Sequence, residues 1–357
     1  MLSPANYKEL LSGKRRGVGA ALLRCGLRLA EPLYGLGVWW RNRAYDRGRR
    51  TIHRAGVPVI CVGNLTVGGT GKTPLVEWLA RWMRERGVRV AIVSRGYGAE
   101  EGALNDEALE LEQKLPDVPH VQNPDRVEAA RVAVEELDCN LILLDDGFQH
   151  RRLARDLDLV LIDALEPFGY GHLLPRGLLR EPLSVLQRAH AVILSRADLI
   201  DEAERKRIRD VVERHAPDAA WAEVAHKPVA LIDCDGRRRE LSELRDRRVA
   251  AFCGIGNPAA FRRTLERCGV ELVAMREFPD HHAYAQSDIT ELTGWLAEPG
   301  DIDFVVCTHK DLVKVGLARL GRTPLYALAV GIEILHGENS LDALLEPLTQ
   351  RGETPAV

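Results

Sequence analysis

The sequence predicts an α/β fold, in which a mostly parallel β-sheet carries helices on both faces and a smaller α/β domain follows it. First, short apolar, β-branched runs alternate with segments of helical periodicity from residue 57 onward. Second, a glycine-rich stretch joins the first such run to the first such helix. Third, 357 residues with 46% hydrophobic and 28% charged side chains suit a globular protein of two domains.

The glycine-rich stretch, residues 63–74, reads GNLTVGGTGKTP. A strand is predicted before it over 57–62, and a helix after it carries an apolar stripe from Leu75 to Met83. Strand, glycine-rich turn, Lys-Thr and helix are the layout of a phosphate-binding P-loop, so the first domain is predicted to be P-loop NTPase-like.

This loop has a specific chemistry. Its glycines let backbone N–H groups approach phosphate oxygens, and the helix adds its positive N-terminal end. Lys72 can reach the β- and γ-phosphates, and the Thr73 hydroxyl suits Mg²⁺. The strict motif has glycine where Thr66 stands, which leaves a coincidental turn as the alternative. The predicted nucleotide-binding residues are Thr66, Val67, Gly68, Gly69, Thr70, Gly71, Lys72 and Thr73.

The rest of the first domain continues the alternation. Residues 100–115 are acidic and predict a loop with a short helix. The other predicted elements are strands over 89–93, 141–144, 157–162 and 191–194, and helices over 124–137 and 201–214.

The predicted strand 141–144 ends in two carboxylates, Asp145 and Asp146, within the stretch LILLDDGFQH. Because the carboxyl ends of parallel strands lie beside the phosphate loop, these groups are predicted to hold Mg²⁺ or its waters. The alternative is the solvated start of a loop. Gln149 and His150 follow, and their spacing allows either supporting contacts to the site or capping of the chain.

The alternation of predicted strands and helices changes near residue 222, which predicts that the chain has three parts. These are a P-loop domain over 1–222, a linker over 223–248 and a smaller C-terminal α/β domain over 249–357. The linker is interpreted as an extended hairpin. The predicted elements of the last part are strands over 249–253, 271–275 and 304–307 and helices over 259–268 and 287–296.

Histidines and an aspartate cluster in the second domain, within FPDHHAY at 278–284. Asp280, His281 and His282 allow three interpretations: a metal cluster, a base assembly or a polar turn. Adjacent histidines rarely face the same way, which disfavours a metal site with both.

Three further motifs are weaker. GIGNPA at 254–259 fits a dinucleotide fingerprint, but a tight strand–helix turn with Pro258 opening the helix is the better interpretation. SRAD at 195–198 and THKD at 308–311 loosely resemble a guanine-reading motif without matching it. They keep a P-loop GTPase or metallochaperone-type switch protein open as the alternative function.

Charge is distributed unevenly. The net charge is only −3, which gives no case for nucleic acid, yet residues 1–56 hold 12 basic and three acidic side chains. Leucines and tryptophans share this segment, and arginines interrupt it too often for it to span a bilayer. A basic amphipathic helix over about 1–50 that contacts an anionic membrane is predicted, with an ordinary packed helix as the alternative. The seven scattered cysteines suggest neither a zinc site nor a disulfide framework.

Together these motifs resemble one family, the tetraacyldisaccharide 4′-kinases. GNLTVGGTGKTP, SRGYG (94–98), DDGFQH, LLPRGLLREP (173–182) and F-x-D-H occur here in that family's order, and its P-loop also has threonine at the position of Thr66. The resemblance implies ATP- and Mg²⁺-dependent transfer of the γ-phosphoryl group to the 4′-hydroxyl of a tetraacylated glucosamine disaccharide 1-phosphate. It further implies a peripheral protein at the cytoplasmic face of the inner membrane, a two-stranded linker and a site between the domains. No obligate protein partner is evident from the sequence.

The resemblance also implies roles for individual residues. The family's G-D-E-P motif maps to residues 105–108, so Asp106 is the implied base, although Asn105 and Ala108 replace glycine and proline. The family's partner histidine maps to His281, which would orient the Asp106 carboxylate. With Lys72, these are the predicted catalytic residues. Candidates for binding the substrate phosphate are three arginines, Arg95, Arg176 and Arg180, each with an ordinary surface ion pair as the alternative.

Overall fold

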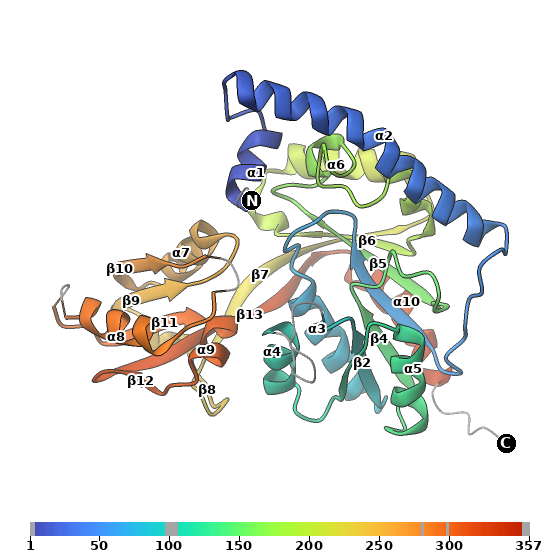
Figure 1. Ribbon diagram of the computed structural model, residues 1–357. Coiled ribbons are helices and arrows are strands. Elements are labelled where there is room, and N and C mark those ends of the chain that lie inside the picture. Colours follow the sequence, from blue (N-terminus) through green and yellow to red (C-terminus); the bar gives the residue numbers. More distant parts are fainter. Residues whose placement is uncertain (1–3, 97–105, 280–281, 298–299, 352–357) are drawn as a thin grey trace.

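The computed structural model describes residues 4–96, 106–279, 282–297 and 300–351 (Figure 1). Its first lobe is built on a fully parallel set of strands. These are β1 (Val59–Asn64), β2 (Val90–Ser94), β3 (His120–Gln122), β4 (Leu141–Asp145), β5 (Leu157–Asp163) and β6 (Ala191–Ser195).

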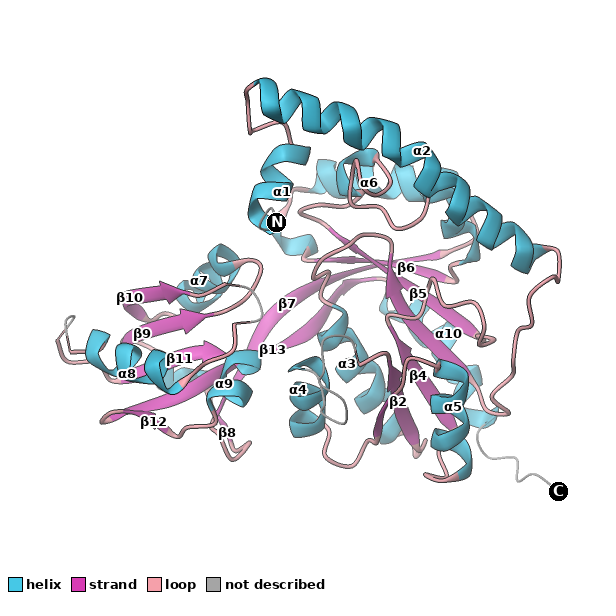
Figure 2. Cartoon of the chain, viewed as in Figure 1, coloured by secondary structure: helices cyan, strands magenta, loops and turns pink. Residues whose placement is uncertain are grey.

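The second lobe has a smaller sheet of its own strands: β9 (Arg248–Cys253), β10 (Glu271–Glu277), β11 (Phe304–Thr308) and β12 (Arg319–Leu320). Two long strands join the lobes, β7 (Ala220–Ile232) and β13 (Thr323–His336), and β8 (Arg238–Arg239) forms a short hairpin with β7. One sheet therefore runs through both lobes, in the order β10-β9-β11-β13-β7-β6-β5-β1-β4-β2-β3 (Figure 2).

Helices cover both faces of this sheet. On one face of the first lobe lie α3 (Lys72–Glu85), α4 (Asp106–Lys114) and α10 (Glu338–Arg351), and on the other lie α5 (Arg126–Glu135) and α6 (Glu202–His215). In the second lobe, α7 (Pro258–Arg267) covers one face, and α8 (Gln286–Trp295) and α9 (His309–Val315) cover the other. The predicted α/β class, mostly parallel and covered on both faces, is confirmed.

The central strand shows why its sequence is continuously apolar. Ile60 and Val62 face the cluster formed with α3, whereas Val59 and Cys61 face the cluster formed with α5, and all four are at most 1% exposed. A strand buried on both faces loses the alternation that marks a half-exposed strand.

The N-terminal segment forms α1 (Pro4–Leu11) and the 29-residue α2 (Val18–Asp46), which crosses the top of the first lobe in Figure 1. Short 3₁₀ turns complete the described chain: η1 (Gly169–Gly171), η2 (Leu183–Arg188), η3 (Ala197–Leu199) and η4 (Leu241–Leu244).

Two predicted features of the connection differ from the structure. The region 223–248 is not a self-contained hairpin, because β7 pairs along most of its length with β13, antiparallel, from Ala327↔Ile232 to His336↔Glu223. The two-stranded connection is thus made by segments about 100 residues apart in the sequence.

The end of the chain also differs from the prediction of a C-terminal domain over 249–357. Leu341, Leu345 and Leu348 of α10 join the buried cluster around α3, and Trp82 Nε1 donates to Asp342 Oδ1 at 3.0 Å. The last helix returns to the first lobe because its apolar stripe is buried there.

Candidate functional site

The phosphate loop lies between the end of β1 and the start of α3, where the eight predicted residues 66–73 are contiguous. Gly68 and Gly71 have φ of 124° and 85°, values that L side chains rarely adopt. Thr66 is 6% exposed and its backbone pairs with Leu179. It needs no glycine, because this extended pairing keeps its φ negative.

Neighbouring segments hold this loop from two sides. Ser195 Oγ donates to the carbonyl of Thr70 at 2.7 Å, and Arg196 Nη2 donates to the carbonyl of Gly69 at 2.9 Å. From the other side, Val67 N donates to Leu178 O at 2.9 Å. The loop is thus fixed through the carbonyls of Gly69 and Thr70 and through the N–H of Val67.

Within the loop, Asn64 Nδ2 donates to Thr70 Oγ1 at 3.0 Å, and both residues are buried. The sequence analysis singled out neither Asn64 nor the Ser195–Arg196 turn as a support of this loop.

A charge cluster lies at the end of β4. Lys72 Nζ is 3.3 Å from Asp146 Oδ1, and Arg180 Nη1 is 2.9 Å from Asp146 Oδ2. Burial favours the neutral acid, but the two cations outweigh it, so the pKa of Asp146 lies below its ordinary value. Asp145, the last residue of β4, is 5% exposed. Lysine, arginine and carboxylates therefore meet at the mouth of the phosphate loop.

Gln149 belongs to the same cluster. Its amide Nε2 donates to Asn64 O at 2.7 Å, and its Oε1 accepts from Arg180 Nη1 at 3.4 Å. His150 is partly buried, and burial followed by the charges of Arg126 and Arg152 lowers its pKa to about 4. Gln149 links the loop to Arg180, whereas His150 is an uncharged neighbour of the basic side chains.

The three predicted phosphate-binding arginines differ in their surroundings in the structure. Arg180 contacts Asp146, as described. Arg176 instead pairs with Glu31 of α2 at 3.0 Å, so it ties the N-terminal helix to the loop over 173–182. Arg95 follows β2, and its charge acts on Arg126.

Two buried charges were missed by sequence reasoning. Arg126 is 8% exposed at the first position of α5, and its pKa is lowered by burial and by Arg95, while Asp146 and Asp145 act in the opposite direction. The sequence feature that could have identified Arg126 is an arginine at a helix N-terminus, where the helix dipole disfavours a cation. Glu181, fully buried, accepts from side chains that no sequence pattern links to it.

The two remaining catalytic candidates lie partly or wholly outside the described residues. Helix α4 begins at Asp106, but the structure does not describe that side chain, and it does not describe His281 at all. The neighbouring His282 Nε2 lies 3.2 Å from Asp288 Oδ2, and its ring stacks on Phe278.

The helix that begins at Asp106 contacts the second lobe. His309 Nε2 of α9 lies 3.0 Å from Gln113 Oε1 of α4, and His309 is only 4% exposed. Burial lowers the pKa of His309 to about 4, so it is an uncharged imidazole within this contact.

The weaker motifs of the second lobe have structural roles. Asp311 of the THKD stretch is fully buried and accepts from Gly254 N at 3.1 Å and Tyr284 OH at 3.0 Å. Asn257 of the GIGNPA stretch caps α7 by accepting from Ala260 N at 3.1 Å. A buried, fully engaged carboxylate cannot read a nucleobase.

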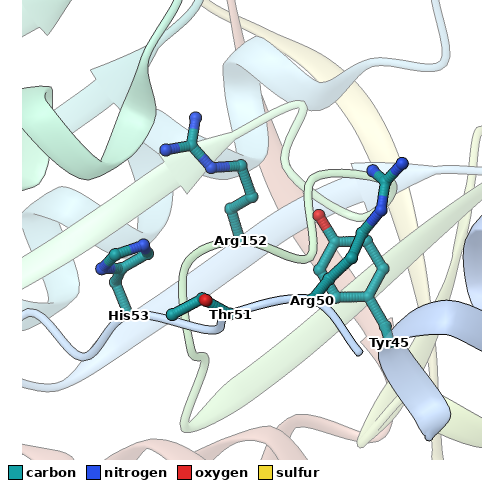
Figure 3. A pocket seen from close by; sticks show the side chains of 5 residues that line it. All are labelled: Tyr45, Arg50, Thr51, His53 and Arg152. Carbon is teal, nitrogen blue, oxygen red and sulfur yellow. The ribbon is translucent and has the colours of Figure 1, made fainter. Parts of the chain in front are cut away.

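Within the described ranges, no group of three or more His, Cys, Asp or Glu side chains is arranged to hold a metal ion. A hollow of about 270 Å³ follows α2 and is lined by Tyr45, Arg50, Thr51, His53 and Arg152 (Figure 3). It contains none of the predicted site residues. Its arginines have partners, since Arg50 lies over the ring of Tyr45 and Arg152 pairs with Asp125.

The chain is similar to proteins of one family along most of its length. The family model described as "Tetraacyldisaccharide-1-P 4'-kinase" matches residues 23–350. A tetraacyldisaccharide 4′-kinase of Anaeromyxobacter dehalogenans (strain 2CP-C) is 43% identical over 353 residues, covering 93% of this chain and 92% of that protein. One of Geobacter sulfurreducens is 37% identical over 361 residues, covering 95% and 98%.

A solved structure is similar along nearly the whole chain. LpxK from Aquifex aeolicus, crystallised in complex with ATP, has a TM-score of 0.72 and 31% sequence identity, covering 92% of this chain and 99% of that one.

Proposed function

We propose below how this chain binds ATP and transfers the phosphoryl group. It belongs to the tetraacyldisaccharide-1-P 4'-kinase family and has that family's activity in lipid A biosynthesis. The observation that carries the proposal is the cluster of Lys72, Asp146 and Arg180 at the mouth of the phosphate loop. The alternative of a GTPase-type switch is not favoured, because Asp311 is engaged within the second lobe.

ATP is the proposed donor, as in the Aquifex aeolicus complex. Backbone N–H groups of residues 68–73 and the N-terminus of α3 would hold its phosphates. Lys72 is 3.3 Å from Asp146 and would move to the β- and γ-phosphates, whose charge exceeds that of one carboxylate.

Mg²⁺ is the proposed metal, and the donor set fits it. Thr73 supplies a hydroxyl beside the loop, and Asp145 and Asp146 supply carboxylates at the end of β4. Mg²⁺ prefers such oxygen ligands and completes its shell with waters and nucleotide phosphates, so one or two protein ligands suffice. When bound, it neutralises charge on the β- and γ-phosphate oxygens.

Asp106 is the proposed base, oriented by His281. The carboxylate accepts the proton of the 4′-hydroxyl while that oxygen bonds to the γ-phosphorus and the bond to the β-phosphate oxygen breaks, leaving ADP. The packing of α4 against α9 supports this arrangement, since it brings the helix that begins at Asp106 against the lobe that carries His281. Arg95 and Arg180, with the buried Arg126, are proposed to bind phosphate oxygens.

The proposed division of the chain follows its two lobes. We assign residues 1–219 and the last helix, α10, to the P-loop part, β7 and β13 to the connection, and residues 249–322 to the smaller part. The active site lies between the two lobes in this proposal, because α4 and α9 meet there.

An anionic membrane surface is the proposed partner of α2. No described helix is long and apolar enough to cross a bilayer. The apolar side chains Val18, Leu22, Leu29, Leu33, Leu36 and Trp40 are 60–79% exposed and recur at helical spacing along one stripe. Such a stripe with neighbouring arginines suits a helix that lies in the interface of an anionic, inner-membrane leaflet.

The test is phosphoryl transfer by the purified protein. With ATP, Mg²⁺ and the tetraacylated disaccharide 1-phosphate, we expect a product phosphorylated at the 4′ position. Lys72→Ala should lower the rate on the order of 10²–10³-fold, as for other preorganised groups that stabilise developing charge. No product from the wild-type protein, or a Lys72→Ala variant as fast as wild type, would contradict the proposal.

A further inference from the structure

The imidazole of His226 lies directly against the phosphate loop. A Cβ atom added to Gly71 would stand 2.1 Å from Cε1 and 2.5 Å from Nε2 of His226. Gly71 has φ = 85° and is the N-cap residue of α3, immediately before Lys72. The edge of the ring therefore fills the space that a side chain at position 71 would need.

His226 reaches the loop from the connection between the lobes. It lies on β7 opposite Ile332 of β13, two residues beyond Val224, which pairs with Ser195 at the end of β6. A change in the bend of the β7–β13 pair would therefore move the ring against, or away from, Gly71.

Packing holds this ring in place. Nε2 is buried and has no hydrogen-bond partner among the residues that the structure describes. Burial, followed by the charge of Arg196, lowers the pKa of His226 to about 4, so the ring is uncharged at neutral pH and does not compete with Lys72 for phosphate.

The turn beside His226 is also held from the second lobe. Arg196, which donates to the carbonyl of Gly69, lies two residues before Asp198, and both charges act on His226. Asp198 Oδ2 accepts from Arg267 Nη1 of α7 at 2.9 Å. The loop is thus supported at Gly69 and at Gly71 by groups that are linked to the second lobe.

We propose that His226 is a positioning residue of the phosphate loop: its ring holds Gly71 and the start of α3 in the geometry that binds ATP, and it couples that geometry to the strands between the lobes. This inference rests on the proposed function, because ATP is the ligand whose binding it sets. The inference does not involve the chemistry of the acceptor sugar.

Binding of a non-hydrolysable ATP analogue, measured by calorimetry, tests the inference. His226→Ala should weaken binding about tenfold and raise the KM for ATP similarly, with the KM for the disaccharide changed less than twofold. His336→Ala, at an exposed end of β13 in the same strand pair, is the matched control and should bind as wild type. Thermal unfolding checks each variant, and His226→Gln replaces His226→Ala if the latter is not folded.

A double variant provides the sharper test. Gly71→Ala should abolish binding because its methyl group meets the ring, and Gly71→Ala with His226→Ala should regain at least tenfold over the single variant. A deficit of about 5–30-fold against the His226→Ala single variant should remain, since the left-handed backbone disfavours any Cβ. Wild-type affinity in His226→Ala and His226→Gln, or a double variant that binds no better than Gly71→Ala, would overturn the inference. If the wild-type protein itself binds no analogue, the proposed function fails instead.

Discussion

Glu181→Ala should destabilise the protein more than the loss of an ordinary surface ion pair. Glu181 belongs to the loop over 173–182 and is fully buried, paired with Arg41 of α2. It accepts from Arg41 Nη2 at 2.5 Å, Asn42 Nδ2 at 2.9 Å and Arg188 Nη2 at 2.7 Å. Its chain neighbour Arg180 donates its backbone N–H to Leu65 O, so the same segment supports the phosphate loop.

The magnitude follows from what the substitution leaves behind. Two hydrogen bonds to charged donors contribute about 1.5–3 kcal/mol each and the amide bond about 1 kcal/mol. Arg41 is a third exposed and regains water, whereas the Arg188 side chain is only 17% exposed and stays an unpaired cation. We therefore expect a loss of about 3–5 kcal/mol in the free energy of unfolding, the range for breaking a buried ion pair. Glu181→Gln keeps a hydrogen-bond acceptor and should lower the free energy of unfolding by less.

Urea unfolding followed by tryptophan fluorescence measures this difference. The control is Glu135→Ala, which removes an exposed i,i+4 pair with Arg131 and should change the free energy of unfolding by less than about 0.5 kcal/mol. If Glu181→Ala is no more destabilised than Glu135→Ala, the buried carboxylate does not hold α2 to the first lobe, and the reasoning fails.

Two further predictions concern charge and exposure. Because Lys72 and Arg180 lower the pKa of Asp146, its ion pairs stabilise the folded protein fully above about pH 4 and lose that contribution as the pH falls through the lowered value. Asp146→Asn should flatten the dependence of the Tm on pH in this acid range. An unchanged slope of Tm against pH would contradict a stabilising role for these ion pairs. The protein should sediment with anionic liposomes, less so as salt is raised, and Leu33→Glu should weaken sedimentation while Leu137→Glu should not. Equal sedimentation of both variants would show that α2 is not the contact.

The phosphate loop and the acidic strand end could be predicted because their signals are local. A continuously apolar strand, glycines and a lysine within residues 57–72 suffice to predict the first, and two carboxylates after an apolar run predict the second. In the structure, Lys72 Nζ and Asp146 Oδ1 are 3.3 Å apart.

The long strands between the lobes could not be predicted from local patterns. β7 and β13 each serve both lobes, so their burial changes along their length and they show neither a steady alternation nor a continuous apolar run. β3 has three half-buried residues, too few for any periodicity. α10 contains Pro347, which usually indicates the end of a helix.

Buried charges were missed for a related reason. Two of the three partners of Glu181, Arg41 and Asn42, lie about 140 residues earlier in the chain, so its burial depends on how α2 packs and no local pattern marks it. His226 is similar, since its contact with Gly71 exists only because β7 lies beside β6.

The most direct test of the central claim compares wild type with Asp106→Ala in the same assay. Initial rates with ATP, Mg²⁺ and the tetraacylated disaccharide 1-phosphate are measured together with the Kd of a non-hydrolysable ATP analogue, and NMR locates the new phosphate. We expect 4′ phosphorylation by wild type, a kcat at least about 10²-fold lower for Asp106→Ala, and an analogue Kd changed less than about threefold. An undiminished kcat, or a loss confined to ATP affinity, would contradict the role of Asp106 as the base.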